Sequence, residues 1–235
     1  MHIFYTPLIS ADETDFTLSE EESKHCVRVL RLAIGSNVRL IDGKGGMFEA
    51  QVIDDHPKRT RLRIDSFTIS EKIRDYHLHL MVAPTKNIER FEWFLEKATE
   101  IGVDEITPIV CDHSERKEVK WDRLNKIIIA AMKQSQQYYL PQLNDIIGFN
   151  EIISKNTSSK KFIAHCEDGK KQFLSECLNP KEDVIILIGP EGDFSSQEIK
   201  QAIAASFVPI SLGNTRLRTE TAATVAVLET SLINR

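Results

Sequence analysis

The sequence predicts an α/β fold with a parallel sheet, preceded by a small β-rich domain. From His77 onward, apolar strand-like runs alternate with amphipathic helical runs, as in parallel sheets covered by helices. The residues before this point carry several short β-rich runs at close spacing, which predicts a small barrel. The polar stretch SEKIRDYH lies between the two patterns. We therefore expect one domain at residues 1–72 and a second at residues 73–235.

The N-terminal part is expected to hold one short helix, at about residues 20–32, followed by three β-rich runs. These runs are NVRLIDG, MFEAQVIDD and RLRIDSFTIS, and the turn GKGG separates the first two. The region is also locally basic, through Lys24, Arg28, Arg31, Arg39, Lys44, Lys58, Arg59, Arg61 and Arg63. Ordinary solvated side chains and a nucleic-acid-binding patch are both compatible with this pattern.

The second part is expected to contain five strands and four helices. Gly102 is the predicted stop of the first helix, and Ser195 and Glu198 have the spacing of a capping box. The strands are predicted within residues 78–84, 105–111, 161–166, 184–189 and 208–213. The helices are predicted at residues 88–102, 121–135, 195–206 and 219–234.

Composition excludes several classes of protein. The formal net charge of -5 argues against a general polyanion binder, so any nucleic-acid contact must come from a local patch. The N-terminal segment MHIFYTPLIS lacks the pattern of a signal peptide, and no apolar run has the length of a membrane span, so we expect a cytoplasmic protein. The four cysteines form no C-x-x-C pair, and His77 and His79 lack a nearby third ligand, so no metal site is expected.

Two strand exits carry the candidate chemistry, because ligands of open α/β sheets bind beyond the carboxyl ends of strands. The first exit, IGPEGDF, has neither a Walker loop nor a dinucleotide fingerprint. Glu191 and Asp193 would also repel an anion there, so a neutral or cationic ligand such as S-adenosylmethionine fits better. An ordinary tight turn is the alternative.

The second exit is LGNTRLRTETA. Thr219 is a suitable helix N-cap, and Glu220 suits the first turn of the helix that follows. Arg216 and Arg218 have no such structural explanation. They are candidates for binding an anionic group, with surface salt bridges as the alternative.

Together, the segments HCVRVLRLAIG, APTKNIERFEWFLEKATEIGV, AAMKQSQQYYLPQL, LIGPEGDFSSQE and LGNTRLRTETAATVAVLE resemble the RsmE-type 16S rRNA uridine-N3 methyltransferases of the SPOUT superfamily. The resemblance covers nearly the whole chain. It implies a PUA-like RNA-binding domain, then a SPOUT α/β domain with a trefoil knot that binds S-adenosylmethionine. It also implies a homodimer that acts on 16S rRNA within the small ribosomal subunit.

For the chemistry, we suggest that Arg218 is catalytic and stabilises the uracil anion that develops when N3 loses its proton, while solvent or a carboxylate accepts that proton. Glu220 is a candidate for this carboxylate, with helix capping as its alternative role. The resemblance assigns roles to further residues. The cofactor-binding candidates are His165, Glu167, Leu187, Ile188, Gly189, Pro190, Glu191, Gly192, Leu212, Gly213, Leu217, Thr219 and Thr221. The RNA-binding candidates are His25, Arg28, Arg31, Lys86 and Gln134.

The chain departs from the family pattern at Asp193, where a second glycine is usual, and at Lys133 and Gln137, where a glutamate and an arginine are usual. Two other functions are weighed against the main one. A SPOUT enzyme acting on tRNA or on ribose would share the fold. A non-catalytic RNA-binding assembly protein would not be expected to keep both cofactor loops.

Overall fold

The computed structural model describes residues 1–72, 74–154 and 159–235. The chain divides into two compact units, which we describe separately. The N-terminal unit consists of Met1–Ile73 together with Met132–Leu140, and the sheet unit consists of Arg74–Ala131 together with Pro141–Arg235. The segment 132–140 therefore joins the N-terminal unit although it follows much of the sheet unit in sequence, an arrangement that the sequence did not indicate.

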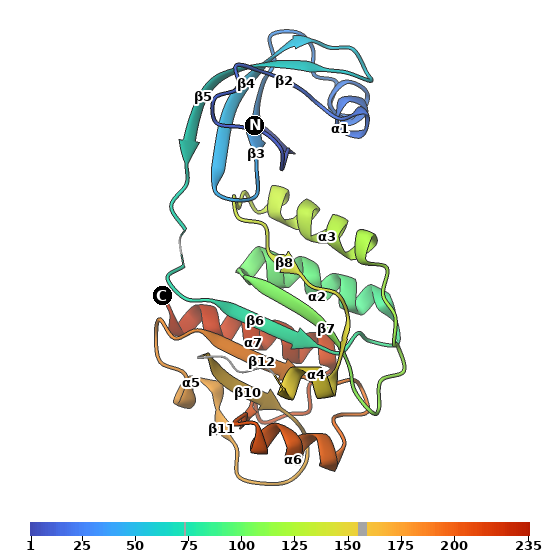
Figure 1. Ribbon diagram of the computed structural model, residues 1–235, viewed down its shortest axis with the longest axis vertical. Coiled ribbons are helices and arrows are strands. Elements are labelled where there is room, and N and C mark those ends of the chain that lie inside the picture. The colour runs from blue at the N-terminus through green and yellow to red at the C-terminus, as the bar shows by residue number, and fades with distance from the viewer. Residues whose placement is uncertain (73, 155–158) are drawn as a thin grey trace. The chain divides into compact units, whose positions relative to one another are not determined.

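The N-terminal unit is built on a five-stranded sheet with the order β1-β3-β4-β5-β2 (Figure 1). Its strands pair antiparallel except for β1 and β3, which are parallel. Burial alternates along β4, as expected for a strand with one face on a core. The core contains Phe4, Leu40, Phe48, Val52 and Leu62. The strands are β1 (His2–Tyr5), β2 (Asp15–Thr17), β3 (Asn37–Ile41), β4 (Gly46–Asp54) and β5 (Arg61–Ile69).

The predicted helix at residues 20–32 is shorter than expected. An α-helix, α1 (Glu20–Lys24), continues into one turn of π-helix, η1 (His25–Val29). Arg31 then adopts a φ of 56°, a left-handed conformation that cannot continue a helix. The prediction of helix up to Leu32 was therefore wrong by a few residues. The π-turn includes His25 and Arg28, two of the RNA-binding candidates.

The segment 132–140 is attached to the N-terminal unit by polar contacts. Lys133 Nζ pairs with Glu22 Oε1 at 2.9 Å, and Arg39 donates to the Tyr138 hydroxyl at 3.1 Å. The Tyr139 hydroxyl donates to the Ser70 carbonyl oxygen at 3.0 Å. Lys133, one of the predicted departures from the family pattern, is therefore held by an acidic residue of α1.

The sheet unit is built on a parallel sheet with the order β11-β13-β10-β12-β6-β7-β8, and β9 pairs with β7 (Figure 1). The strands β6, β7, β10, β12 and β13 confirm the five that the sequence predicts, whereas the two-residue strands were not anticipated. The sheet contains β6 (Leu78–Val82), β7 (Glu105–Val110), β8 (Gln142–Leu143), β9 (Ile147–Gly148), β10 (Lys160–Ala164), β11 (Gln172–Phe173), β12 (Val184–Ile188) and β13 (Val208–Ser211).

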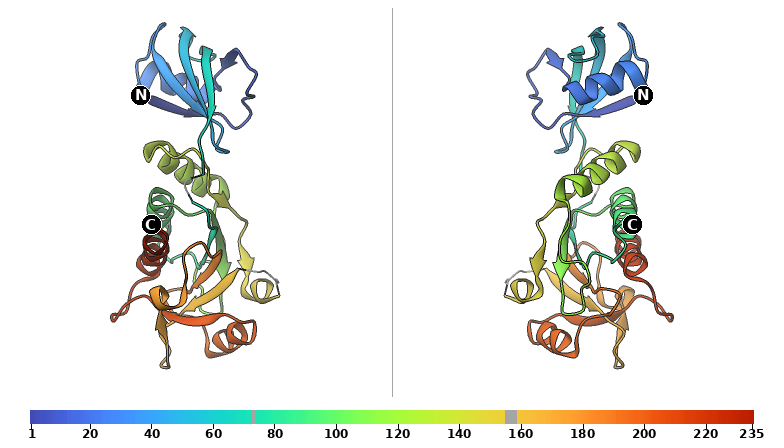
Figure 2. Two further views of the ribbon diagram at one scale, coloured as in Figure 1. Left: turned by 90° about the vertical axis from the view of Figure 1, so that its left-hand side faces the viewer. Right: turned by 90° about the vertical axis from the view of Figure 1, so that its right-hand side faces the viewer.

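Helices cover both faces of this sheet. Figure 2 shows α2 and α7 together on one face, with α4 and α6 on the other. The second face has a core that includes Met81, Ile163, Leu187, Phe194 and Ile199. The helices are α2 (Ile88–Ile101), α3 (Trp121–Gln134), α4 (Phe149–Ile153), α5 (Leu174–Cys177), α6 (Ser196–Ala204) and α7 (Thr219–Ile233).

The helix ends follow the local sequence. Ser195 accepts from the Glu198 backbone N–H, and the Glu198 carboxylate accepts from the Ser195 backbone N–H, which confirms the predicted capping box of α6. Asn87 caps α2 at its start, and Gly102 ends it with a φ of 120°.

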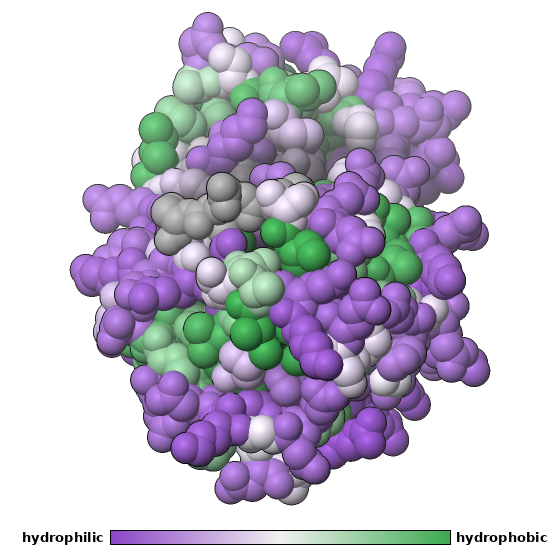
Figure 3. Space-filling view, turned by 60° about the horizontal axis from the view of Figure 1, so that its bottom comes forward, coloured by the Kyte–Doolittle hydropathy of each residue, from purple (hydrophilic) through white to green (hydrophobic). Residues whose placement is uncertain are grey.

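The surface seen in Figure 3 is mainly hydrophilic, with separate apolar patches. Among the described residues, no helix combines the length and apolar character needed to span a membrane.

The end of α2 gives a stability prediction. Gly102→Ala must hold alanine at a φ of 120° and bring its Cβ against the Arg74 guanidinium. We expect the free energy of unfolding to fall by about 1–3 kcal/mol, measured by chemical denaturation. Gly148→Ala is the matched control, because the φ of Gly148 is −78° and its added Cβ meets only Glu151 Oε1, 3.7 Å away. An equal effect of the two substitutions would contradict the backbone explanation.

Candidate functional site

The candidate site lies where three neighbouring strands end. Strands β12, β10 and β13 are adjacent and parallel, so the segments that follow them meet at one edge of the sheet. Two cavities of about 300 and 360 Å³ open among these segments. The smaller is lined by residues 188–191 and the larger by residues 210–215. The two cavities share Ala164, Cys166, Arg216, Leu217 and Ala222.

Thr219 connects the two loops that the sequence identified. Its hydroxyl donates to the carbonyl oxygen of Gly189 at 3.0 Å, and the residue is buried. The expectation that Thr219 caps α7 was wrong, because Arg218 occupies the N-cap position and Thr219 is the first helical residue. Its side chain is instead used to hold the loop after β12 against the start of α7.

The two acidic residues of the first loop are satisfied by backbone donors. Glu191 Oε1 accepts from the backbone N–H of Lys86 at 2.9 Å, in the loop after β6. Asp193 Oδ2 accepts from the Cys166 N–H at 2.7 Å, and Asp193 Oδ1 accepts from the Phe194 N–H at 2.8 Å. Each carboxylate is therefore engaged in tying the first loop to a neighbouring part of the chain.

Asp193 also has a backbone reason to replace glycine. Its φ is 65°, a left-handed conformation that glycine adopts freely and that aspartate tolerates better than most residues. Its N–H donates to the Pro190 carbonyl oxygen at 2.9 Å, which closes the turn. Aspartate thus keeps the turn of a glycine and adds a link to the segment after β10.

A further support of the first loop was missed at the sequence level. His113 Nδ1 lies 3.0 Å from the Gly192 oxygen and 3.1 Å from the Asp193 oxygen, so this nitrogen must carry the proton. The neighbouring Asp112 accepts from the Ser195 hydroxyl at 2.6 Å. These residues follow β7. Their position after a predicted strand is the only sequence signal that could have identified them as site residues.

His165 lines the larger cavity, as expected for a ligand-facing residue. Both its ring nitrogens are buried, and neither has a hydrogen-bond partner among the described residues. Burial lowers the pKa of His165, and the nearby Lys171 ammonium lowers it further, so the neutral ring is favoured. Burying two ring nitrogens without hydrogen bonds costs free energy. A ligand in the cavity can form hydrogen bonds with them and remove this cost.

The other cofactor candidates fall into two groups. Those that line one of the two cavities are Ile188, Gly189, Pro190, Glu191, Leu212, Gly213, Leu217 and Thr219. The side chain of Leu187 lies in the hydrophobic core, Gly192 packs against His113, and Glu167 accepts from the Ser196 hydroxyl. Neither these three nor Thr221 lines either cavity. Cys166, Lys171 and Ala222 do, although they were not predicted.

Arg216 and Arg218 both line the smaller cavity and are exposed. Within the described part of the chain, neither side chain forms an ion pair with a carboxylate. The salt-bridge alternative is therefore not observed, and both guanidinium groups are available to an anionic partner. Glu220 is different: it is buried, does not line the cavity, and places Oε1 4.0 Å from Arg90 Nε on α2.

The RNA-binding candidates are distributed over both units. In the N-terminal unit, Arg28, Arg31 and Gln134 are exposed, and the His25 ring lies edge-on to Phe4 with centroids 6.3 Å apart. In the sheet unit, Lys86 is exposed and its Nζ pairs with Glu115 Oε2 at 2.7 Å. Gln137, another predicted departure from the family pattern, donates to the Ser135 hydroxyl oxygen at 3.1 Å.

Comparison with known proteins identifies the family. A family model described as an RNA methyltransferase domain matches residues 72–230, and a model of an RNA methyltransferase PUA domain matches residues 18–65. The chain belongs to this RNA methyltransferase family. It is 30% identical to the ribosomal RNA small subunit methyltransferase E of Buchnera aphidicola, over 90% of this chain and 85% of the relative.

Solved structures of family members agree. A "probable rRNA-methyltransferase" from Porphyromonas gingivalis is 38% identical with a TM-score of 0.92, covering 100% of this chain and 98% of that chain. A ribosomal RNA small subunit methyltransferase E from Neisseria gonorrhoeae, bound to S-adenosyl methionine, is 28% identical with a TM-score of 0.90, covering 100% and 98%. The predicted fold class, a SPOUT α/β methyltransferase domain preceded by a PUA-like domain, is confirmed.

The cavities fit the cofactor of this family. Ile188, Leu217 and Ala222 give the smaller cavity apolar walls suited to a flat heterocycle, while His165 offers unused polar atoms in the larger one. The nearby carboxylates of Glu191 and Asp193 add negative electrostatic potential to the cavities. Each of these carboxylates also accepts hydrogen bonds from backbone N–H groups. These features suit a ligand that carries both an aromatic base and positive charge.

Asp193 supplies a test of the loop geometry. Asp193→Gly removes both carboxylate bonds, and Asp193→Ala removes the same bonds and also forces alanine to a φ of 65°. We expect both variants to be less stable than the natural protein, with the alanine variant lower by about a further 1 kcal/mol. Chemical denaturation of the two variants checks this order. Equal stability of the glycine and alanine variants would show that the backbone is not held as described.

Proposed function

We propose that this protein transfers a methyl group from S-adenosylmethionine to N3 of a uridine in 16S rRNA. The observation that carries the proposal is the pair of cavities between the loops after β12 and β13, joined by the bond from Thr219 to Gly189. The relatives named as small subunit methyltransferases support the substrate, and the cofactor-bound relative from Neisseria gonorrhoeae supports the cofactor.

In this proposal the cofactor occupies the two cavities. Ile188 and Leu217 would contact the base, with backbone groups of residues 187–192 and 212–213 as hydrogen-bonding partners. His165 would use a ring nitrogen on the polar part of the ligand. Thr219 acts by holding Gly189 in place, and Glu191 and Asp193 act by fixing the loop. Glu167 and Thr221 line neither cavity, so we assign them no direct contact with the cofactor.

The bound cofactor supplies an electrophilic methyl group on its sulfonium. The residues of this chain must then orient the uracil and stabilise the charge that appears when N3 loses its proton. Arg218 lies at the smaller cavity, is exposed and has no ion-pair partner among the described residues. A guanidinium in this position stabilises the uracil anion and lowers the effective pKa of its N3 proton. Glu220 is turned towards Arg90, so it is a poor candidate for the proton acceptor.

We assign RNA binding to the domain at residues 1–72 and methyl transfer to the domain at residues 73–235. The exposed Arg28 and Arg31 of the first domain are suited to phosphate contacts. The PUA family match at residues 18–65 supports this division. The net charge of -5 favours a target presented within an assembled small subunit over indiscriminate binding of naked RNA.

We further propose a cytoplasmic homodimer. On the face of the sheet covered by α2 and α7, Trp93, Leu228 and Leu232 remain 46%, 40% and 48% exposed. Exposed apolar side chains on neighbouring helices are typical of a surface that a second subunit covers.

The function is tested with small ribosomal subunits from cells that lack this protein. Incubation with the purified protein and S-adenosylmethionine should produce 3-methyluridine in 16S rRNA, detected by mass spectrometry of nucleosides. Arg218→Ala should lower the rate by a factor of about 100 or more, and calorimetry should show nearly unchanged cofactor affinity.

The outcomes separate the alternatives. Methylation of ribose or of tRNA would point to another member of the same fold class. Absence of cofactor binding would point to a non-catalytic assembly protein. A loss of cofactor affinity in Arg218→Ala without a specific loss of turnover would reject the catalytic role of Arg218 and leave the rest of the proposal standing.

A further inference from the structure

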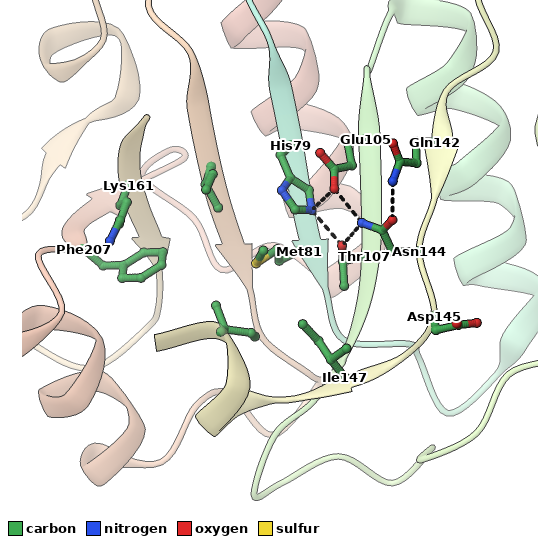
Figure 4. A pocket seen from close by; sticks show the side chains of 12 residues that line it. His79, Met81, Glu105, Thr107, Gln142, Asn144, Asp145, Ile147, Lys161 and Phe207 are labelled. Carbon is green, nitrogen blue, oxygen red and sulfur yellow. Dashed lines mark hydrogen bonds and ion pairs between the residues drawn. The ribbon is translucent and has the colours of Figure 1, made fainter. Parts of the chain in front are cut away.

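A separate cavity of about 530 Å³ lies at the opposite end of the strands from the cofactor loops (Figure 4). It covers the first halves of β10, β12, β6 and β7, on the face that α4 and α6 cover further along. All of its lining residues belong to the sheet unit. Neither the family match nor the proposed methyl transfer assigns it a role.

The floor of this cavity is a single row across four strands. Lys161 pairs in register with Ile185, Ile185 with His79, and His79 with Glu105. The row therefore runs from an ammonium through an apolar side chain and an imidazole to a carboxylate. Figure 4 shows Lys161 on one side of the cavity and His79 and Glu105 on the other.

The acidic side is organised by a hydrogen-bond network. Asn144 Nδ2 donates to Glu105 Oε1 at 2.6 Å and to Thr107 Oγ1 at 2.8 Å, and Thr107 Oγ1 lies 2.7 Å from His79 Nε2. Both amide hydrogens of Asn144 are thereby used. Gln142 Nε2 in turn donates to Asn144 Oδ1 at 2.7 Å, and the exposed Asp145 adds a second carboxylate to the lining of the cavity. This side is suited to a cationic donor.

In the part of the chain that the structure describes, no lysine or arginine forms an ion pair with the Glu105 carboxylate. The nearest positively charged candidates within the described residues are the rings of His77 and His79, each 3.6 Å away and charged only when protonated. Its side chain is 21% exposed, so water screens it only in part.

The basic side of the cavity is formed by the Lys161 ammonium. Lys161 Nζ donates to the Ala205 carbonyl oxygen at 3.3 Å and lies 5.5 Å from the centre of the Phe207 ring. It has no carboxylate within ion-pair distance in the part of the chain that the structure describes. Two of its three N–H bonds are left for another acceptor. This half-buried ammonium is suited to an anionic group.

The geometry sets the length of a ligand that joins the two sides. Three strand spacings, or about 14 Å, separate the backbones of Lys161 and Glu105. If both side chains extend from the sheet in the same direction, their charged groups keep about this separation, and an ion pair of about 3 Å at each end leaves about 8 Å between the charges of the ligand. Ile185 and Met81 lie between the two ends, so the connecting stem should be apolar.

We propose that this cavity binds a zwitterion of the 6-aminohexanoate type, with its ammonium at Glu105 and its carboxylate at Lys161. An extended six-carbon ω-amino acid separates its two charges by about 8 Å. Lysine has the same separation between its side-chain ammonium and its carboxylate. The natural ligand is therefore a free lysine-like amino acid or the carboxyl-terminal lysine of a polypeptide.

The test uses 6-aminohexanoate as the probe, with ligand-observed NMR and calorimetry on the full-length protein. We expect saturable binding, with hexanoate and hexylamine each weaker by about tenfold or more, because each lacks one charge. No binding of the probe at millimolar concentration would overturn the proposal. Equal binding of hexylamine or of hexanoate would also overturn it, by showing that one end alone is responsible.

Protein variants address the two ends separately. Glu105→Gln keeps an oxygen for Asn144 and removes the charge, and Lys161→Met keeps an apolar stem. Each should weaken the probe by about tenfold. Lys200→Met, on the exposed side of α6, is the control and should leave binding unchanged. Titration of S-adenosylmethionine into the same samples shows whether a variant is folded. It also distinguishes a failure of the zwitterion proposal from a failure of the methyltransferase proposal.

Three further ligands distinguish the sources. Stronger binding of Nα-acetyl-lysine than of lysine would assign the cavity to the carboxyl-terminal lysine of a polypeptide. The reverse order would assign it to the free amino acid. N-acetyl-lysine amide lacks the carboxylate, so its binding should be the weakest of the three. Equal binding of the amide would contradict the role of Lys161.

Discussion

The hydrogen bond between the Thr219 hydroxyl and the Gly189 carbonyl oxygen is the contact on which the candidate methyltransferase site depends. It is buried and it joins two loops that lie about thirty residues apart in sequence. The loop after β12 forms one wall of the site, and the segment leading into α7 forms the other. Parallel pairing of β10, β12 and β13 brings the three strand ends to one edge, and this bond links the two walls directly there.

The acidic residues of the first loop have a different role from the one that their charge implies. From the sequence alone, Glu191 and Asp193 are expected to select against an anionic ligand. In the structure their carboxylates accept backbone N–H groups from the segments after β6 and β10. Their negative charge still contributes to the local potential, but their first effect is to hold the loop. Arg216 and Arg218 differ from these acids, since both residues are exposed and line the smaller cavity.

The parts of the fold that local sequence determines were predictable. Apolar periodicity located the five main strands and the four longer helices, and the capping residues Ser195 and Gly102 marked their ends. The return of residues 132–140 to the N-terminal unit was not predictable, because it depends on contacts such as that between Arg39 and Tyr138, far apart in sequence. The role of His113 was missed for the same reason. Thr219 was mistaken for a cap because its true partner, Gly189, is specified only by the tertiary fold.

The central claim is that the bond from Thr219 to Gly189 holds the cofactor site together, and isothermal titration with S-adenosylmethionine tests it most directly. Thr219→Val has nearly the same shape but leaves a buried carbonyl oxygen without its donor, whereas Thr219→Ser keeps the hydroxyl. We expect the valine variant to bind the cofactor about tenfold or more weakly and the serine variant to stay close to the natural protein. Equal affinity of the valine variant and the natural protein would contradict it.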